Sequence, residues 1–187
     1  MSTVLEEKLA AAPHAAGPSF RLAVEPDGLG IVFFDTPGEK VNKYSASVLR
    51  ELDGFLDDLA KRTDLKALVL VSSKPDIFIA GADVAEIATA EPALVAEGVR
   101  FGQRAFGKLA NLPYPTVAAI DGACVGGGCE TALAMDWRLA SDAKKTQIGL
   151  PEIRLGILPA WGGCSRLPRI AGLAAEEIGR ASCRERV

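Results

Sequence analysis

The stretch IDGACVGGGCE, residues 120–130, decides the fold of this chain. An apolar strand expected over residues 116–120 leads into it, three consecutive glycines interrupt it, and a helix is expected over residues 128–134. Glycines at such a break leave the backbone uncovered, and the first N–H groups of a helix have no partner within the helix. The positive end of the helix dipole adds to their effect, so this turn is suited to hold negative charge.

A second turn of the same kind lies in the stretch IFIAGADV, residues 77–84. Small residues end its apolar strand, and Asp83 with Glu86 has the spacing of a capping box at the start of a short helix. One backbone N–H from each turn could stabilise an oxyanion on a carbonyl, and the loss of one such donor typically costs about 3–4 kcal/mol of barrier. A phosphate is the other candidate anion, but the glycines match neither GxGxxG nor GxxxxGK followed by Ser or Thr. Close helix–sheet packing is the purely structural explanation of the glycines.

The rest of the chain alternates short apolar strands with amphipathic helices. We expect strands over residues 20–24, 29–35, 66–72, 137–140 and 146–148, and helices over residues 45–62 and 92–109. Two strands often precede a helix, which is typical of an α/β protein whose core lies between sheet and helices. A length of 187 residues fits one such domain, which we place at residues 19–176.

The composition excludes several classes of protein. Hydrophobic residues make up 49% of the chain and the net charge is −3, so it can fill a core but lacks the basic excess of a nucleic-acid binder. No apolar run reaches the ~18 residues of a membrane span, and the acidic start does not resemble a secretion signal. The cysteines are therefore expected to be reduced thiols in the cytoplasm. The one histidine, His14, lies in an expected flexible leader at residues 1–18, so neither a histidine triad nor a His-ligated metal site is predicted.

Two glutamates are the candidate acid and base. Glu130 lies one turn into the helix after the glycines, and Glu152 lies in the apolar loop GLPEIRLGILP, residues 149–159. Two carboxyl groups beside one water could activate it and deliver a proton, provided that burial raises one pKa toward neutrality. A solvated surface acid is the ordinary alternative for each. Lys43 and Lys74 could meet a polyphosphate tail, although surface charge is the commoner role of such lysines.

Three motifs in this order, FIAGAD at 78–83, IDGACVGGGCE at 120–130 and GLPEIRLGILP at 149–159, resemble the crotonase, or enoyl-CoA hydratase/isomerase, superfamily. The resemblance runs from about residue 20 to residue 172. Its middle and end are most similar to the N-terminal hydratase region of multifunctional fatty-acid oxidation alpha subunits. It implies an α/β fold made of a spiral of ββα units, usually trimeric, that binds an acyl-CoA thioester. No separate cofactor is implied, because coenzyme A is part of the substrate.

The resemblance also assigns the backbone groups that bind substrate. By position, Ala80 and Gly127 match the residues whose N–H groups form the family's oxyanion hole. Gly81, Ala82 and Asp83 fall in its acyl-CoA binding loop.

Glu130 and Glu152 match the two acids of the family's hydratases, which hold the water that adds across the 2,3 double bond. The resemblance gives Glu130 the role of water base and Glu152 that of proton donor to the α-carbon. The presence of both acids favours an enoyl-CoA hydratase of fatty-acid β-oxidation. A Δ3-Δ2 enoyl-CoA isomerase, a non-catalytic acyl-CoA binding module and a nucleotide-binding α/β domain remain the alternatives.

Two departures from the family pattern bear on these expectations. Ala160 and Trp161 stand where the family more often has a glycine and a small or varied residue, which would alter the acyl pocket; otherwise Trp161 is expected to pack. Residues 177–187 match no family pattern and resemble the translation of a DNA-sequencing adapter, so we interpret them as a non-native tail. The catalytic part is then incomplete at its carboxyl end, and the sequence leaves open whether this chain is active alone. The intact protein is expected to be a homo-oligomer or part of a fatty-acid oxidation complex.

Overall fold

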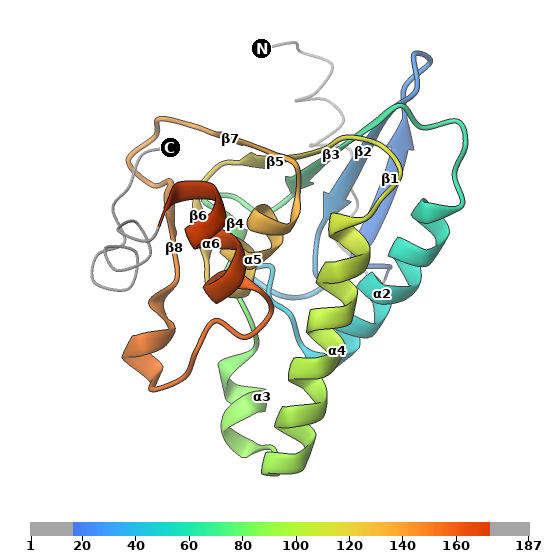
Figure 1. The fold of residues 1–187 in the computed structure, drawn as a ribbon. Coiled ribbons are helices and arrows are strands. Elements are labelled where there is room, and N and C mark those ends of the chain that lie inside the picture. Colours follow the sequence, from blue (N-terminus) through green and yellow to red (C-terminus); the bar gives the residue numbers. More distant parts are fainter. Residues whose placement is uncertain (1–16, 173–187) are drawn as a thin grey trace.

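Two sheets form the framework of the protein in a computed structural model that describes residues 17–172 (Figure 1). The larger sheet has the order β1-β2-β3-β5-β7, with β1 Phe20–Val24, β2 Leu29–Phe34, β3 Ala67–Ser72, β5 Thr116–Ile120 and β7 Trp137–Ala140. The smaller has the order β4-β6-β8, with β4 Ile77–Ile79, β6 Ala123–Val125 and β8 Gln147–Gly149. Only β1 and β2, which form a hairpin, pair in antiparallel fashion among the described strands.

Helices follow the strand pairs. They are α2 Ala46–Ala60, α3 Val84–Thr89, α4 Pro92–Ala110, α5 Gly127–Ala134, the 3-10 helix η1 Pro151–Leu155 and α6 Gly163–Ala171. A strand of the large sheet, a strand of the small sheet and then a helix recur as β3-β4-α3, β5-β6-α5 and β7-β8-η1. This repetition is the spiral of ββα units that the motifs implied.

The long helices form where the apolar periodicity predicted them. Helix α2 begins after Ser45, whose hydroxyl accepts the N–H of Val48 at 3.2 Å, and it buries one apolar face. Helix α4 covers the expected range. Three elements were missed: residues 123–125 were expected as part of a turn but form β6, the expected loop of residues 149–159 contains η1, and α6 was not predicted. Strand β6 is too short, and α6 too rich in glycine and proline, for periodicity to reveal them.

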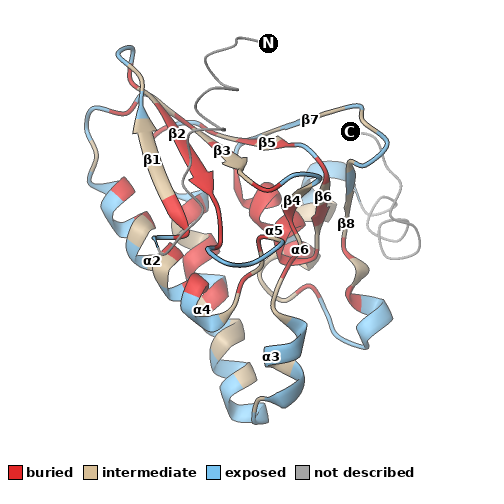
Figure 2. Cartoon of the chain, turned by 180° about the vertical axis from the view of Figure 1, so that it is seen from behind, coloured by how far each residue is buried: buried red, intermediate tan, exposed pale blue. Residues whose placement is uncertain are grey.

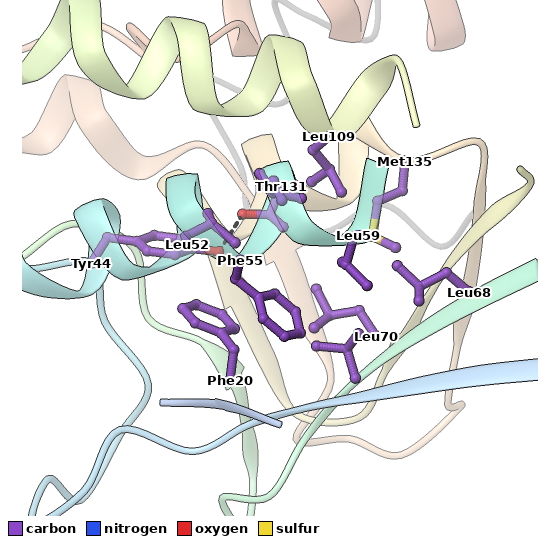
Figure 3. Close-up of a pocket in the computed structure, with 12 residues that line it drawn as sticks. Phe20, Tyr44, Leu52, Phe55, Leu59, Leu68, Leu70, Leu109, Thr131 and Met135 are labelled. Atoms are coloured by element: carbon purple, nitrogen blue, oxygen red, sulfur yellow. Dashed lines mark hydrogen bonds between the residues drawn. The ribbon is translucent and has the colours of Figure 1, made fainter. Parts of the chain in front are cut away.

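The apolar core lies between the large sheet and helices α2, α4 and α5. Figure 2 shows that α5 is buried throughout whereas α3 lies at the surface. A small apolar cavity of about 20 Å³ remains between α2 and the sheet, with Tyr44 and Thr131 joined across its wall by a 2.9 Å hydrogen bond (Figure 3). It has room for about one water molecule and is too small for an acyl chain.

Within residues 17–172, no helix has both the length and the hydrophobicity that crossing a bilayer requires. The predicted tail, His14 and all but the last two residues of the predicted leader lie outside the described residues, so those assignments stay predictions.

Candidate active site

The glycine turn at the start of α5 has a backbone that only glycine adopts easily. Gly126 has φ +56° and ψ −126°, and its N–H donates to the carbonyl of Gly149 in β8 at 3.0 Å. A Cβ on Gly128 would lie 2.3 Å from the carbonyl oxygen of Ile79, so the helix can approach β4 only without a side chain there. The N–H of Gly127 enters no hydrogen bond with any described residue. A free N–H at the amino end of a buried helix is what an oxyanion requires.

The second turn follows β4 and pairs with the segment of residues 42–46. In it, the N–H of Ala80 donates to the carbonyl of Asn42 at 2.8 Å. This hydrogen bond contradicts the prediction that the N–H of Ala80 is free to hold an oxyanion. The motif could not reveal the pairing, because the partner lies 38 residues earlier in the chain.

Ala82 has the free N–H of this turn. Tyr44 donates its N–H to the carbonyl of Gly81 at 2.8 Å and accepts the N–H of Asp83 at 3.0 Å. Extended backbone alternates the direction of its polar groups, so the N–H of Ala82 points away from Tyr44, and no described residue accepts it. A Cβ on Gly81 would lie 3.4 Å from the nitrogen of Gly127, which shows that the two turns are in contact. Gly127 and Ala82 are therefore the donor pair that this geometry supports.

The side chain of Asp83 shapes the turn. Its carboxylate accepts the N–H groups of Ala85 and Glu86 at the start of α3, and it pairs with Lys43 at 3.0 Å. This pairing lowers the pKa of Asp83. The predicted capping box is only half formed, because the carboxylate of Glu86 accepts the N–H of Ala46 instead.

Lys74 does not face a ligand. It is buried, forms a 2.6 Å ion pair with Asp35 and donates to the carbonyl of Thr36 at 2.9 Å. Both possibilities raised for Lys74, contact with a polyphosphate tail and an ordinary surface charge, are thus contradicted.

Glu130 is a buried carboxyl group held at one oxygen. It lies in the first turn of α5, and its Oε1 accepts the N–H of Trp161 at 2.7 Å and that of Gly163 at 2.8 Å. Burial, together with the charge of Glu152, raises the pKa of Glu130 to about 7, although the two N–H donors oppose the shift. The Oε2 atom is left for another partner.

Glu152 lies on η1 and is also buried. A Cβ on Gly126 would lie 3.1 Å from its Oε1, which places the carboxyl group against the glycine turn. Its Oε2 is buried and has no hydrogen-bond partner in the described part of the chain. Burial raises the pKa of Glu152. The structure thus brings two acids that are 22 residues apart close enough for the charge of one to raise the pKa of the other.

The turn of residues 161–163 holds Glu130, and sequence reasoning missed this role. Arg166 fixes the turn by donating to the carbonyl of Trp161 at 2.9 Å and to that of Phe106 at 3.3 Å. The two glycines after Trp161 were the available signal, since backbone that donates to a buried acid must come close to it. The packing role expected for Trp161 is confirmed by its edge-on contacts with Tyr44 and Phe106.

A spiral of ββα units with two glycine turns and two buried acids at their meeting point defines a crotonase-type protein. A family model described as enoyl-CoA hydratase/isomerase matches residues 25–181, and the chain belongs to this family, as its motifs predicted. The fatty acid oxidation complex subunit alpha of Vibrio vulnificus is 44% identical over 156 residues, which are 83% of this chain and 22% of that protein.

Solved structures confirm the predicted fold. An enoyl-CoA hydratase of Geobacillus kaustophilus HTA426 matches with a TM-score of 0.81 at 31% identity, over 88% of this chain and 61% of that one. The enoyl-CoA hydratase of Bacillus anthracis gives the same TM-score at 28% identity, over 89% and 63%. The chain thus spans about a fifth of the alpha subunits it matches and about three fifths of these solved chains.

Proposed function

We propose that this chain is the catalytic part of an enoyl-CoA hydratase that adds water across the 2,3 double bond of 2-enoyl-CoA thioesters in fatty-acid β-oxidation. The observation that carries the proposal is the meeting of two buried carboxyl groups, Glu130 and Glu152, at one glycine turn with a free N–H. A non-catalytic binding module would need the turns but not two acids kept in a costly buried position.

The proposed mechanism uses the backbone to stabilise developing charge. The thioester carbonyl oxygen accepts the N–H groups of Gly127 and Ala82, which favours enolate character when water adds to C3. Glu130, ionised, takes a proton from the water through the oxygen that the 161–163 turn leaves open. The resulting hydroxide equivalent forms the C3–O bond, the double-bond electrons move toward the carbonyl, and Glu152, protonated, gives its proton to C2.

The environments of the two acids suit a pair that takes up and releases protons. A pKa of about 7 leaves Glu130 partly ionised near neutral pH. At this pKa the group can both accept a proton from the water and release it afterwards. Burial raises the pKa of Glu152 as well, so the pair can hold one proton between them, and the assignment of base and donor follows the family resemblance. No separate cofactor is part of the proposal. Location in the cytoplasm, and assembly as a homo-oligomer or within a fatty-acid oxidation complex, belong to the same proposal.

The test replaces each acid by its neutral isostere and follows hydration of a 2-enoyl-CoA by loss of the conjugated thioester absorbance. Glu130→Gln and Glu152→Gln are each expected to lower kcat by about 10²–10⁴. Glu97→Gln, on the exposed face of α4, is the matched control and should keep the parent rate. Unchanged hydration in both site variants would overturn the mechanism. Migration of the double bond of a 3-enoyl-CoA, without hydration, would assign the chain to the isomerases.

A further inference from the structure

The indole of Trp161 lies over the oxyanion-binding glycine. A Cβ on Gly127 would meet Cζ3 of the indole at 2.7 Å, so the ring covers the face of this residue. A Cβ on Gly102 of α4 would lie 2.3 Å from Nε1, so the far edge of the ring fits into a notch that only glycine provides.

The position of the ring is fixed at both ends. Tyr44 and Phe106 meet it edge-on, with ring centroids 5.9 Å and 5.4 Å away. Its own backbone is tied to the site, because its N–H donates to Glu130 and its carbonyl accepts from Arg166. A ring held in this way cannot leave its place without disturbing either the α4 notch or the turn that orients the base.

We propose that Trp161 is the residue that limits the length of the acyl chain, so that the site takes short-chain acyl-CoA thioesters. This inference rests on the proposed function. With the thioester oxygen at Gly127 and C3 beside the water on Glu130, the chain from C4 onward must leave past a group that touches both residues. Trp161 is that group, since its ring covers Gly127 and its backbone N–H donates to Glu130.

The consequence for affinity follows from apolar burial. Each methylene that finds an apolar surface gains about fourfold in affinity, and one that meets a wall gains nothing. The parent chain should therefore bind butanoyl-CoA and octanoyl-CoA with similar affinity. Removal of the indole opens apolar space between Tyr44 and Phe106, into which four further methylenes can extend.

The experiment measures binding of saturated butanoyl-CoA and octanoyl-CoA by titration calorimetry, which needs no turnover. Trp161→Ala is expected to raise the affinity for octanoyl-CoA relative to butanoyl-CoA by at least tenfold, and Trp161→Phe by less. Trp137→Ala, which removes an indole 66% exposed on β7, is the matched control and should leave the ratio unchanged. Thermal unfolding checks that each variant folds. If Trp161→Ala does not fold, the milder Trp161→Phe is used for the comparison.

An unchanged ratio in folded Trp161 variants that still bind both thioesters would overturn the role of Trp161 and leave the hydratase proposal intact. Failure of the parent and of every variant to bind either thioester would instead overturn the proposed function, and this inference with it. A Gly102→Ala variant gives an independent check, because its Cβ must push the indole out of its notch. It should weaken butanoyl-CoA binding, and unaltered binding would contradict the proposal.

Discussion

The two strand-to-helix turns look alike in sequence but are closed in different ways. At the start of α3, the side chain of Asp83 caps the helix and the neighbouring backbone is paired with residues 42–46. At the start of α5, Gly126 occupies the cap position and provides no side-chain hydrogen bond. Helix α3 has no buried residue, whereas every residue of α5 is buried.

In the proposed function, the α5 turn is the binding turn and the α3 turn, which adds one N–H, is the supporting turn. A capped helix end has already used its free N–H groups, so it can offer a ligand only the N–H that points away from its partners, here that of Ala82. An uncapped end in a buried setting keeps its N–H groups and dipole unscreened, which is costly unless a ligand arrives. Small residues between a strand and a helix therefore indicate a place for an anion, and the cap decides which turn presents the helix dipole.

The largest expected effect comes from filling the space at the buried turn. Gly128→Ala places a Cβ 2.3 Å from the carbonyl oxygen of Ile79, a backbone atom that cannot swing aside, and should lower the free energy of unfolding by about 3 kcal/mol. Gly81→Ala, in the other turn, should cost about 1–2 kcal/mol, because its φ of +93° is strained for alanine. Urea unfolding measures both.

Gly54→Ala is the control for these substitutions. Gly54 lies inside α2 with nothing within 4 Å of an added Cβ, so alanine should stabilise the protein by about 0.5–1 kcal/mol. A Gly128→Ala protein as stable as the parent would show that α5 is not packed against β4 as described.

A smaller effect is expected from the charge buried beside the binding turn. The pKa of Glu130 is raised to about 7, so the folded chain keeps a proton that the unfolded chain releases near pH 4. The free energy of unfolding must therefore fall as pH rises from about 4 to 7. Glu130→Gln removes this loss and should stabilise the protein at pH 8 by on the order of 2 kcal/mol, measured by urea unfolding across pH.

The comparison with acidic pH makes this prediction specific. Near pH 4 the parent and Glu130→Gln should be about equally stable, because both are neutral at this position and both accept the N–H groups of Trp161 and Gly163. In Glu130→Gln, the free energy of unfolding should still fall somewhat as pH rises, because the pKa of Glu152 is also raised. A variant less stable than the parent at pH 8 would show that the carboxylate is favoured where it lies.

Most of the fold could be predicted, because periodicity and glycine breaks act locally. Helix α2, for example, follows from its cap at Ser45 and its apolar spacing. The placement of Glu130 and Glu152 by motif also agrees with a geometry that brings their charges together. Hydrogen bonds between distant segments could not be predicted from the sequence. The bond from Ala80 to Asn42 and the two bonds from residues 161–163 to Glu130 depend on the path of the whole chain.

The smallest effect is expected at the supporting turn, where cap and ion pair can be separated. Asp83→Ala removes the side chain that accepts two N–H groups of α3 and should cost about 1 kcal/mol.

The ion pair of Asp83 with Lys43 can be removed without removing the cap. Asp83→Asn keeps a capping side chain and loses only this pair. The side chains of Asp83 and Lys43 are 18% and 28% exposed, so the loss should be a few tenths of a kcal/mol. Lys43→Met should cost slightly more than Asp83→Asn, because it also removes the 3.4 Å ion pair of Lys43 with Glu39. Because Lys43 holds the pKa of Asp83 low, the pair's contribution should vanish as pH falls below about 4, where Asp83→Asn and the parent converge. If Asp83→Ala instead destabilised the chain as strongly as Gly128→Ala, the exposed turn would be as essential to the fold as the buried one, and the distinction between a supporting and a binding turn would fail.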